Sequence, residues 1–256
     1  MKTFSLLIIF IVLTIGLAWY FITKDKGKKE PTGALWEAFM FGIVCAVAAI
    51  IIENFFVSLK NTQVGTPILQ LIVNFLKVGF IEEIIKFLPL AIFIYHKRYF
   101  NQFTDGIIYF SLVGLSFGLI ENFGYVLGFG ASDTFARLFL TPFFHASTVA
   151  IVGFYLIKKK INHQKSFTMV ISALIGVIVL HTIYDTGLTV NNQLMNLLSI
   201  VISVGLAINL FLMYFRARDL DQIYGLAEVG INNFCRHCGQ KNKYHLLYCT
   251  RCGYHA

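Results

Sequence analysis

Seven apolar stretches recur along this chain of 256 residues, and they constrain its fold more than any other feature. A helix needs roughly 20 apolar residues to cross the hydrocarbon core of a bilayer. The sequence therefore predicts an all-α fold, a polytopic membrane helix bundle of about seven spans. We place these spans at about residues 4–22, 34–59, 67–95, 104–129, 137–157, 167–189 and 194–215.

Composition supports lipid as the solvent for most of the chain. Hydrophobic residues make up 57% of it and charged residues only 13%, whereas a soluble surface is about a quarter to a third charged. The net charge of +8 does not indicate nucleic acid as a partner. The basic residues form short runs between apolar stretches rather than one stripe.

The first apolar stretch has the length of a secretory signal peptide, but it ends in Trp19, Tyr20 and Phe21. A signal peptidase site needs small residues there, so we interpret the stretch as a retained anchor. We expect three parts: an N-terminal anchor and basic loop (1–33), a membrane core (34–218), and a linker with a small C-terminal domain (219–256).

Lysine and arginine in the short loops predict the orientation, because they are enriched on the cytoplasmic side. One side of the predicted bundle holds only Lys2, Lys60 and Arg137. The other side holds twelve basic residues: Lys24, Lys26, Lys28, Lys29, Lys97, Arg98, Lys158, Lys159, Lys160, Lys165, Arg216 and Arg218. We predict a multi-pass protein of the cell membrane, with its N-terminus outside and its C-terminus in the cytoplasm.

Polar and ionisable residues stand inside four of the predicted spans, where each charge costs at least about 2.5 kcal/mol on insertion scales. These residues are Glu82, Glu83, Lys86, Glu121, Asn122, His145, His181 and Asp185. A rise of about 1.5 Å per residue brings Glu82, Glu121, His145 and His181 to within about 6 Å of mid-membrane. One buried site is therefore expected. The alternative, glutamates neutralised by Lys86 at helical spacing, leaves both histidines unexplained.

Spacing within the spans assigns some roles. His181 and Asp185 are four residues apart, so on a helix the carboxylate can hold a ring N–H of the histidine. Glu82 and Glu83 point about 100° apart, which predicts that one reacts while the other pairs with Lys86 or a backbone donor.

The order of motifs resembles the PrsW family of intramembrane proteases. The motifs are GluGluIleIleLys at 82–86, AspGly at 105–106 with GluAsnPheGlyTyr at 121–125, His145, and HisThrIleTyrAsp at 181–185. The resemblance covers roughly residues 34–215. It implies that membrane-anchored proteins such as anti-sigma factors are cut near the extracytoplasmic face.

The same motifs are similar, more distantly, to the CAAX prenyl endopeptidases and the bacterial CPBP group. That pattern maps onto Glu82 and Glu83, His145, and His181 with Asp185. Thr141 stands where the pattern has phenylalanine, and Asp185 replaces the more usual asparagine.

Two chemistries fit these residues. In one, Glu82 or Glu83 is the general base, His145 and His181 donate to the oxyanion, and Asp185 orients His181. In the other, His145, His181 and a carboxylate hold a catalytic zinc, and the second glutamate is the base. Since no HExxH spacing is present, the sequence favours the glutamate-centred site, with Lys86, Glu121 and Asn122 in support.

Two functions of other classes use the same features. Buried Glu and His side chains also form proton or metal paths in transporters and sensors. The second alternative function is that of an inactive scaffold that presents the C-terminal domain. The order of the motifs favours the peptidase over both.

The tail carries four cysteines, Cys235, Cys238, Cys249 and Cys252, in the pattern CxxC-x10-CxxC. Two such pairs predict a zinc ribbon with a structural zinc, which so small a segment needs in order to fold. A redox-active dithiol is the alternative. Reduced thiols agree with a cytoplasmic tail. There the ribbon would dock a cytoplasmic protein partner or regulate access to the site, and the alternative is that it only stabilises the tail.

Two glycine pairs at four-residue spacing, Gly114 with Gly118 and Gly124 with Gly128, are typical of positions where a second helix approaches closely. The alternative is that glycine is simply common in membrane helices.

Overall fold

The computed structural model describes residues 2–25, 29–58, 72, 74–129, 135–163, 166–190, 192–225, 238 and 251–252. All regular structure in these ranges is helical, which confirms the predicted fold class. Six of its helices are long and apolar enough to cross a membrane. They are α1 (Lys2–Lys24), α2 (Thr32–Ser58), α5 (Phe103–Phe129), α6 (Phe135–Ile161), α7 (Thr168–Thr189) and α8 (Gln193–Ile223).

The third predicted span, 67–95, differs from the other six. Its described part consists of a π-helical turn η1 (Phe75–Gly79), the short helix α4 (Phe80–Pro89) and a second π-helical turn η2 (Leu90–Ile94). Residues 67–71 and 73 lie outside the described ranges. Three charged side chains within ten residues make α4 amphipathic rather than uniformly apolar, so it packs among other helices instead of facing lipid all round.

Pro89 explains where α4 ends. Proline has no backbone N–H, so the carbonyl of Ile85, four residues earlier, loses its usual helical donor. The thiol of Cys45 on α2 donates to that carbonyl at 3.2 Å. A side chain from a neighbouring helix thus satisfies a backbone acceptor that would otherwise be buried without a partner.

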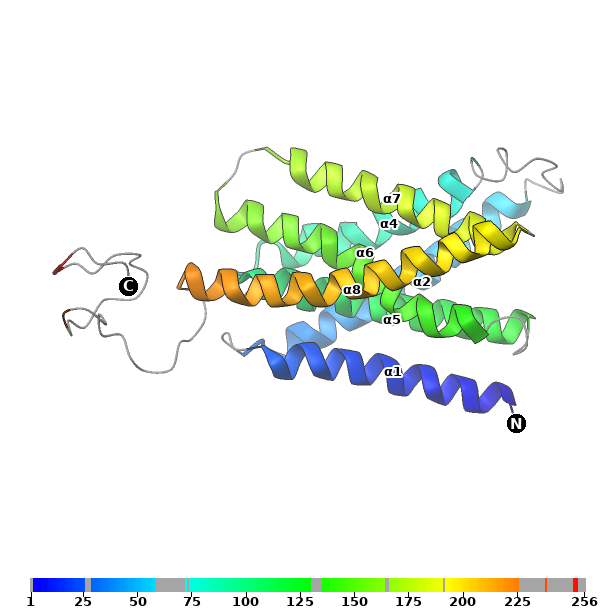
Figure 1. Ribbon diagram of the computed structural model, residues 1–256, viewed down its shortest axis with the longest axis horizontal. Coiled ribbons are helices and arrows are strands. Elements are labelled where there is room, and N and C mark those ends of the chain that lie inside the picture. Colours follow the sequence, from blue (N-terminus) through cyan, green and yellow to red (C-terminus); the bar gives the residue numbers. More distant parts are fainter. Residues whose placement is uncertain are drawn as a thin grey trace.

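Successive elements run in opposite directions through the bundle (Figure 1). The helices α1, α6 and α8 all end at the same end of the bundle, on the left in Figure 1, which we call the α8-terminal end. The η1–α4–η2 segment runs in this direction too, whereas α2, α5 and α7 run the opposite way. Six of these passages are candidate membrane spans, one fewer than the seven predicted, and the remaining passage is the interrupted η1–α4–η2 segment.

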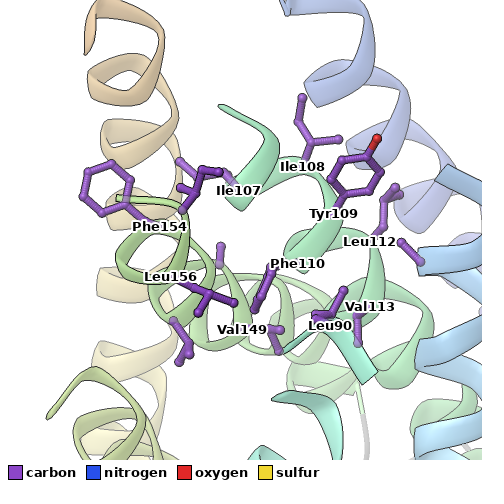
Figure 2. Packing of buried hydrophobic residues seen from close by; sticks show 14 of the residues in the cluster. Leu90, Ile107, Ile108, Tyr109, Phe110, Leu112, Val113, Val149, Phe154 and Leu156 are labelled. Carbon is purple, nitrogen blue, oxygen red and sulfur yellow. The ribbon is translucent and has the colours of Figure 1, made fainter. Parts of the chain in front are cut away.

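The largest hydrophobic cluster lies toward the α8-terminal end. Figure 2 shows side chains from the first half of α5, such as Phe110 and Val113, close to side chains from the last half of α6, such as Val149 and Leu156, and to Leu90. These residues are almost fully buried. Glu121 of α5 and His145 of α6 lie beyond this cluster, in the other half of the bundle.

Glycines on α5 set how closely α6 approaches. A Cβ atom added at Gly118 would lie 2.9 Å from Cδ2 of His145, and one at Gly114 would overlap the His145 carbonyl group. The predicted contact at the first glycine pair is confirmed. For the second pair the structure shows no such contact at Gly124, where an added Cβ would meet no described atom within 4 Å. The surroundings of Gly128 lie outside the described part of the structure.

Candidate active site

Three charged residues of α4 form one ion cluster, because i, i+3 and i+4 positions share a helix face. The Nζ atom of Lys86 lies 2.9 Å from Oε2 of Glu82 and 3.0 Å from Oε1 of Glu83. It also lies 3.9 Å from the centre of the Phe117 ring on α5. The expectation that only one glutamate pairs with Lys86 is wrong, since both do.

His145 of α6 meets this cluster through one ring nitrogen. Its Nδ1 lies 3.0 Å from Nζ of Lys86. Its Nε2 lies 2.5 Å from Oε2 of Glu121 on α5. Both nitrogens are thus engaged by charged side chains of other helices.

His181 of α7 lies between carboxylates. Its Nδ1 is 2.8 Å from Oε1 of Glu83, and its Nε2 is 3.2 Å from Oδ2 of Asp185 and 3.8 Å from Oε2 of Glu82. The contact between His181 and Asp185, predicted from their spacing, is confirmed. A histidine flanked by two carboxylates is held in one orientation.

Four elements therefore bring their polar side chains to one place. We call this group the polar cluster: Glu82, Glu83, Lys86, Glu121, His145, His181 and Asp185. The ring centres of the two histidines are 5.3 Å apart, so the predicted convergence is confirmed. All members are buried except Glu121, whose side chain is 15% exposed. Asn122, predicted to support the site, is fully buried on α5 beside Glu121.

Aromatic side chains pack against the two histidines of the polar cluster. The ring of Phe144 lies edge-on to His181 at 5.0 Å and stacks on Tyr184 at 4.1 Å. Thr141, which stands where the CPBP pattern has phenylalanine, is buried with its hydroxyl 3.4 Å from that of Tyr184. Tyr184 thus supplies aromatic bulk next to Thr141.

One subset of the polar cluster has the geometry of a metal site. Glu82, His145 and His181 each offer one donor atom, and the three atoms lie within 4.8 Å of one another. Two imidazole nitrogens and a carboxylate are the donors of many catalytic zinc sites. The three residues come from three different elements, so no local sequence spacing reveals the set.

Two features of the site were not predicted from the sequence. Phe117 provides the ring beneath Lys86, but one phenylalanine in an apolar span carries no signal. Glu53 on α2 faces the polar cluster as well. It belongs to an IleGluAsnPhe sequence at 52–55 that occurs again at 120–123, where its counterpart is Glu121.

The predicted zinc ribbon lies almost wholly outside the described residues. Cys235 and Cys249 are not described, while Cys238 and Cys252 are described only as isolated turn residues. The tetracysteine site therefore stays a prediction.

A bundle of spanning helices that buries two histidines, a metal-type donor set and additional carboxylates defines a membrane-embedded hydrolytic enzyme. Comparison with known families identifies which one. The chain belongs to the PrsW family of intramembrane metalloproteases, whose model matches residues 30–215. The matched region contains the whole polar cluster but neither α1 nor the cysteines of the tail.

Curated relatives agree. The chain is similar to Protease PrsW of Bacillus subtilis (strain 168), with 33% identity over 176 residues, 68% of this chain and 78% of the relative. Protease PrsW of Clostridioides difficile (strain 630) is 30% identical over 193 residues, 72% of this chain and 79% of the relative. No solved structure matches the chain. The protein is thus an intramembrane protease, the function that the order of the motifs favoured.

Proposed function

We propose that this protease cleaves its substrate with a divalent metal held by Glu82, His145 and His181. The observation that carries the proposal is the mutual distance of at most 4.8 Å between their donor atoms, all from buried side chains. The family description, a metalloprotease, supports it. Zinc fits this mixed nitrogen and oxygen donor set.

The charge of the polar cluster also supports a bound cation. It contains four carboxylates, from Glu82, Glu83, Glu121 and Asp185, and the single ammonium of Lys86. With every carboxylate ionised and both histidines neutral, the charge would be −3, because four negative groups oppose one positive group. Uncompensated charge inside a membrane is costly, so a divalent cation would stabilise the cluster.

The metal-free, glutamate-centred site was favoured in the sequence because no HExxH motif is present. That motif places two histidines on one helix, whereas α4, α6 and α7 each contribute one donor here. The absence of an HExxH motif is therefore compatible with a metal bound by Glu82, His145 and His181.

The contacts of His181 separate the roles of the carboxylates. Its Nε2 faces Glu82 and Asp185, while its Nδ1 faces Glu83 on the other side of the ring. Glu83 thus acts as a positioning residue that orients His181, and Glu121 does the same for His145. Asp185 lies on the side of the ring that faces Glu82, so it is the group placed to accept a proton from the attacking water.

A metal in this place would make water nucleophilic near neutral pH and polarise the scissile carbonyl. Lys86 holds the carboxylates of Glu82 and Glu83 in place. The aromatic side chains of Phe144 and Tyr184 shield the histidines from one side.

Metal content of the full-length protein tests the proposal. The double variant His145→Ala, His181→Ala should contain one metal ion per chain fewer than the native protein, and its proteolysis should be lost. Any zinc of the tail contributes equally to both samples and cancels in the difference. His96→Ala, which removes an exposed histidine, is the matched control. Equal metal content in all three proteins would contradict the proposal.

The orientation in the membrane follows from the loop charges. Twelve basic residues on one side against three on the other support an outside N-terminus and a cytoplasmic C-terminus in the plasma membrane. A C-terminal epitope should resist protease in intact spheroplasts and be digested in inverted vesicles. Digestion in intact spheroplasts would contradict this orientation.

The substrate class follows from the family resemblance and this orientation. The polar cluster lies in the half of the bundle away from the α8-terminal end, which is the extracytoplasmic half in the proposed orientation. A membrane-anchored regulatory protein, such as an anti-sigma factor, would be cut there, in or near its extracytoplasmic membrane boundary.

The tail is proposed to form a structural zinc ribbon that docks a cytoplasmic protein. Its two CxxC pairs, Cys235 with Cys238 and Cys249 with Cys252, support this assignment. The variant Cys238→Ser, Cys252→Ser should lose one zinc ion that the histidine double variant retains. If both variants lost the same ion, the ribbon assignment would be wrong.

A further inference from the structure

Glu53 on α2 belongs to the helix face that packs on the site. Cys45 and Ala49, eight and four residues before it, are buried on that face, and Cys45 bonds to the carbonyl of Ile85 on α4. Cys45 and Ala49 also pack with Phe117 of α5. Helical spacing continues this stripe to Glu53, while the adjacent Asn54 is exposed.

The charged groups that Glu53 faces are those of the polar cluster. Its carboxyl group interacts electrostatically with Glu82 of α4, with Glu121 of α5, and with Asp185 and His181 of α7. Helix α2 therefore adds a fifth carboxyl group, that of Glu53, next to the four carboxylates of the polar cluster. Unlike most members of the polar cluster, the Glu53 side chain is partly exposed, so it lies at the edge of the site.

One oxygen of Glu53 has no donor among the described residues. Its Oε1 atom is buried and makes no hydrogen bond in the part of the chain that the structure describes. By contrast, Lys86 or a histidine contacts the carboxylates of Glu82, Glu83 and Glu121. A buried acceptor without a donor costs on the order of 1–3 kcal/mol, so a donor from outside the described residues would be bound favourably.

A protein substrate inside the membrane brings donors of this kind. A peptide bond becomes open to attack only where the substrate helix unwinds, and the N–H groups freed there need a new acceptor. We propose that Glu53 accepts a hydrogen bond from a substrate main-chain N–H and so positions the unwound segment against the polar cluster. This inference rests on the proposed peptidase function. Glu53 is not part of the described metal-type donor set, so its role is separate from metal binding.

Kinetics of purified full-length variants with one reconstituted single-span substrate test the proposal. Glu53→Leu removes the acceptor at similar volume, and we expect KM to rise roughly tenfold, as for the loss of one hydrogen bond. Glu53→Gln keeps an acceptor oxygen, so its KM should stay within about threefold of the native value. For both variants, kcat and metal content should be close to native. Asn54→Leu, on the exposed side of the same helix, is the matched control.

Three results would overturn the proposal: an unchanged KM in Glu53→Leu, a lost metal ion in either variant, or an equal fall in kcat in both with KM unchanged. Should Glu53→Leu fail to fold, Glu53→Ala gives the same comparison. The proposed function itself is refuted if the native protein shows no proteolysis, or if the variant His181→Ala keeps the activity of the native protein. An active, histidine-dependent enzyme that is indifferent to Glu53→Leu refutes only the role of Glu53.

Discussion

The Nζ atom of Lys86 lies 3.0 Å from Nδ1 of His145, and this contact fixes the histidine tautomer. A lysine ammonium can only donate, so Nδ1 must accept and the ring proton must be on Nε2. That proton is donated to Glu121, whose Oε2 lies 2.5 Å away. Nδ1, whose lone pair accepts from Lys86, therefore faces α4, which also carries Glu82.

Glu121→Ala should weaken the site without changing a metal ligand. Removing a carboxylate that orients a ligating histidine commonly costs about 10- to 100-fold in metal affinity or activity. Glu121→Gln keeps an acceptor for the Nε2 proton, so it should lose less. Competition with a metal-binding dye measures the affinity, and equal affinities in both variants and the native protein would contradict the tautomer assignment.

Lys86→Met should destabilise the metal-free protein. The ammonium is fully buried between Glu82 and Glu83, and removing one partner of a buried ion cluster costs about 3–5 kcal/mol. Lys97→Met removes an exposed lysine and should change the free energy of unfolding by no more than about 0.5 kcal/mol. Denaturant titration in detergent compares the two, and similar stabilities would show that Lys86 does not neutralise the glutamates.

Gly118→Ala should reduce activity by displacing His145. The added methyl would lie 2.9 Å from the imidazole Cδ2, closer than van der Waals contact allows, so either the ring or α6 must move. A shift of this size near the reacting groups can cost about 100-fold in rate. Gly124→Ala, six residues further along α5, meets nothing within 4 Å and should be close to native. If both variants had the same activity, the packing of His145 against α5 would not matter for catalysis.

Local spacing predicted the contacts within one helix. The contact between His181 and Asp185 and the pairing of Lys86 with a glutamate follow from four- and three-residue offsets. Depth in the membrane further predicted that His145 and Glu121 meet the others. Which atoms pair between helices, such as Glu83 with His181, depends on helix rotation and could not be inferred from spacing.

The failures have local causes as well. Glu53 was not counted as a site residue because it stands near the predicted end of its span at residue 59, where charged residues are common. Gly124 was expected at a helix contact, but glycine spacing does not reveal which side of α5 another helix covers. The interrupted third span reflects Pro89 and three charges in one short helix.

Proteolysis by the purified full-length protein tests the central claim most directly. The enzyme would be reconstituted in liposomes with a panel of single-span membrane proteins, and products would be mapped by mass spectrometry. We predict a cut in or beside the substrate span that disappears on chelation, returns with added zinc, and is absent from Glu82→Gln and His181→Ala. A cut that persists in both variants and in the presence of chelator would contradict the assignment of the polar cluster as the active site.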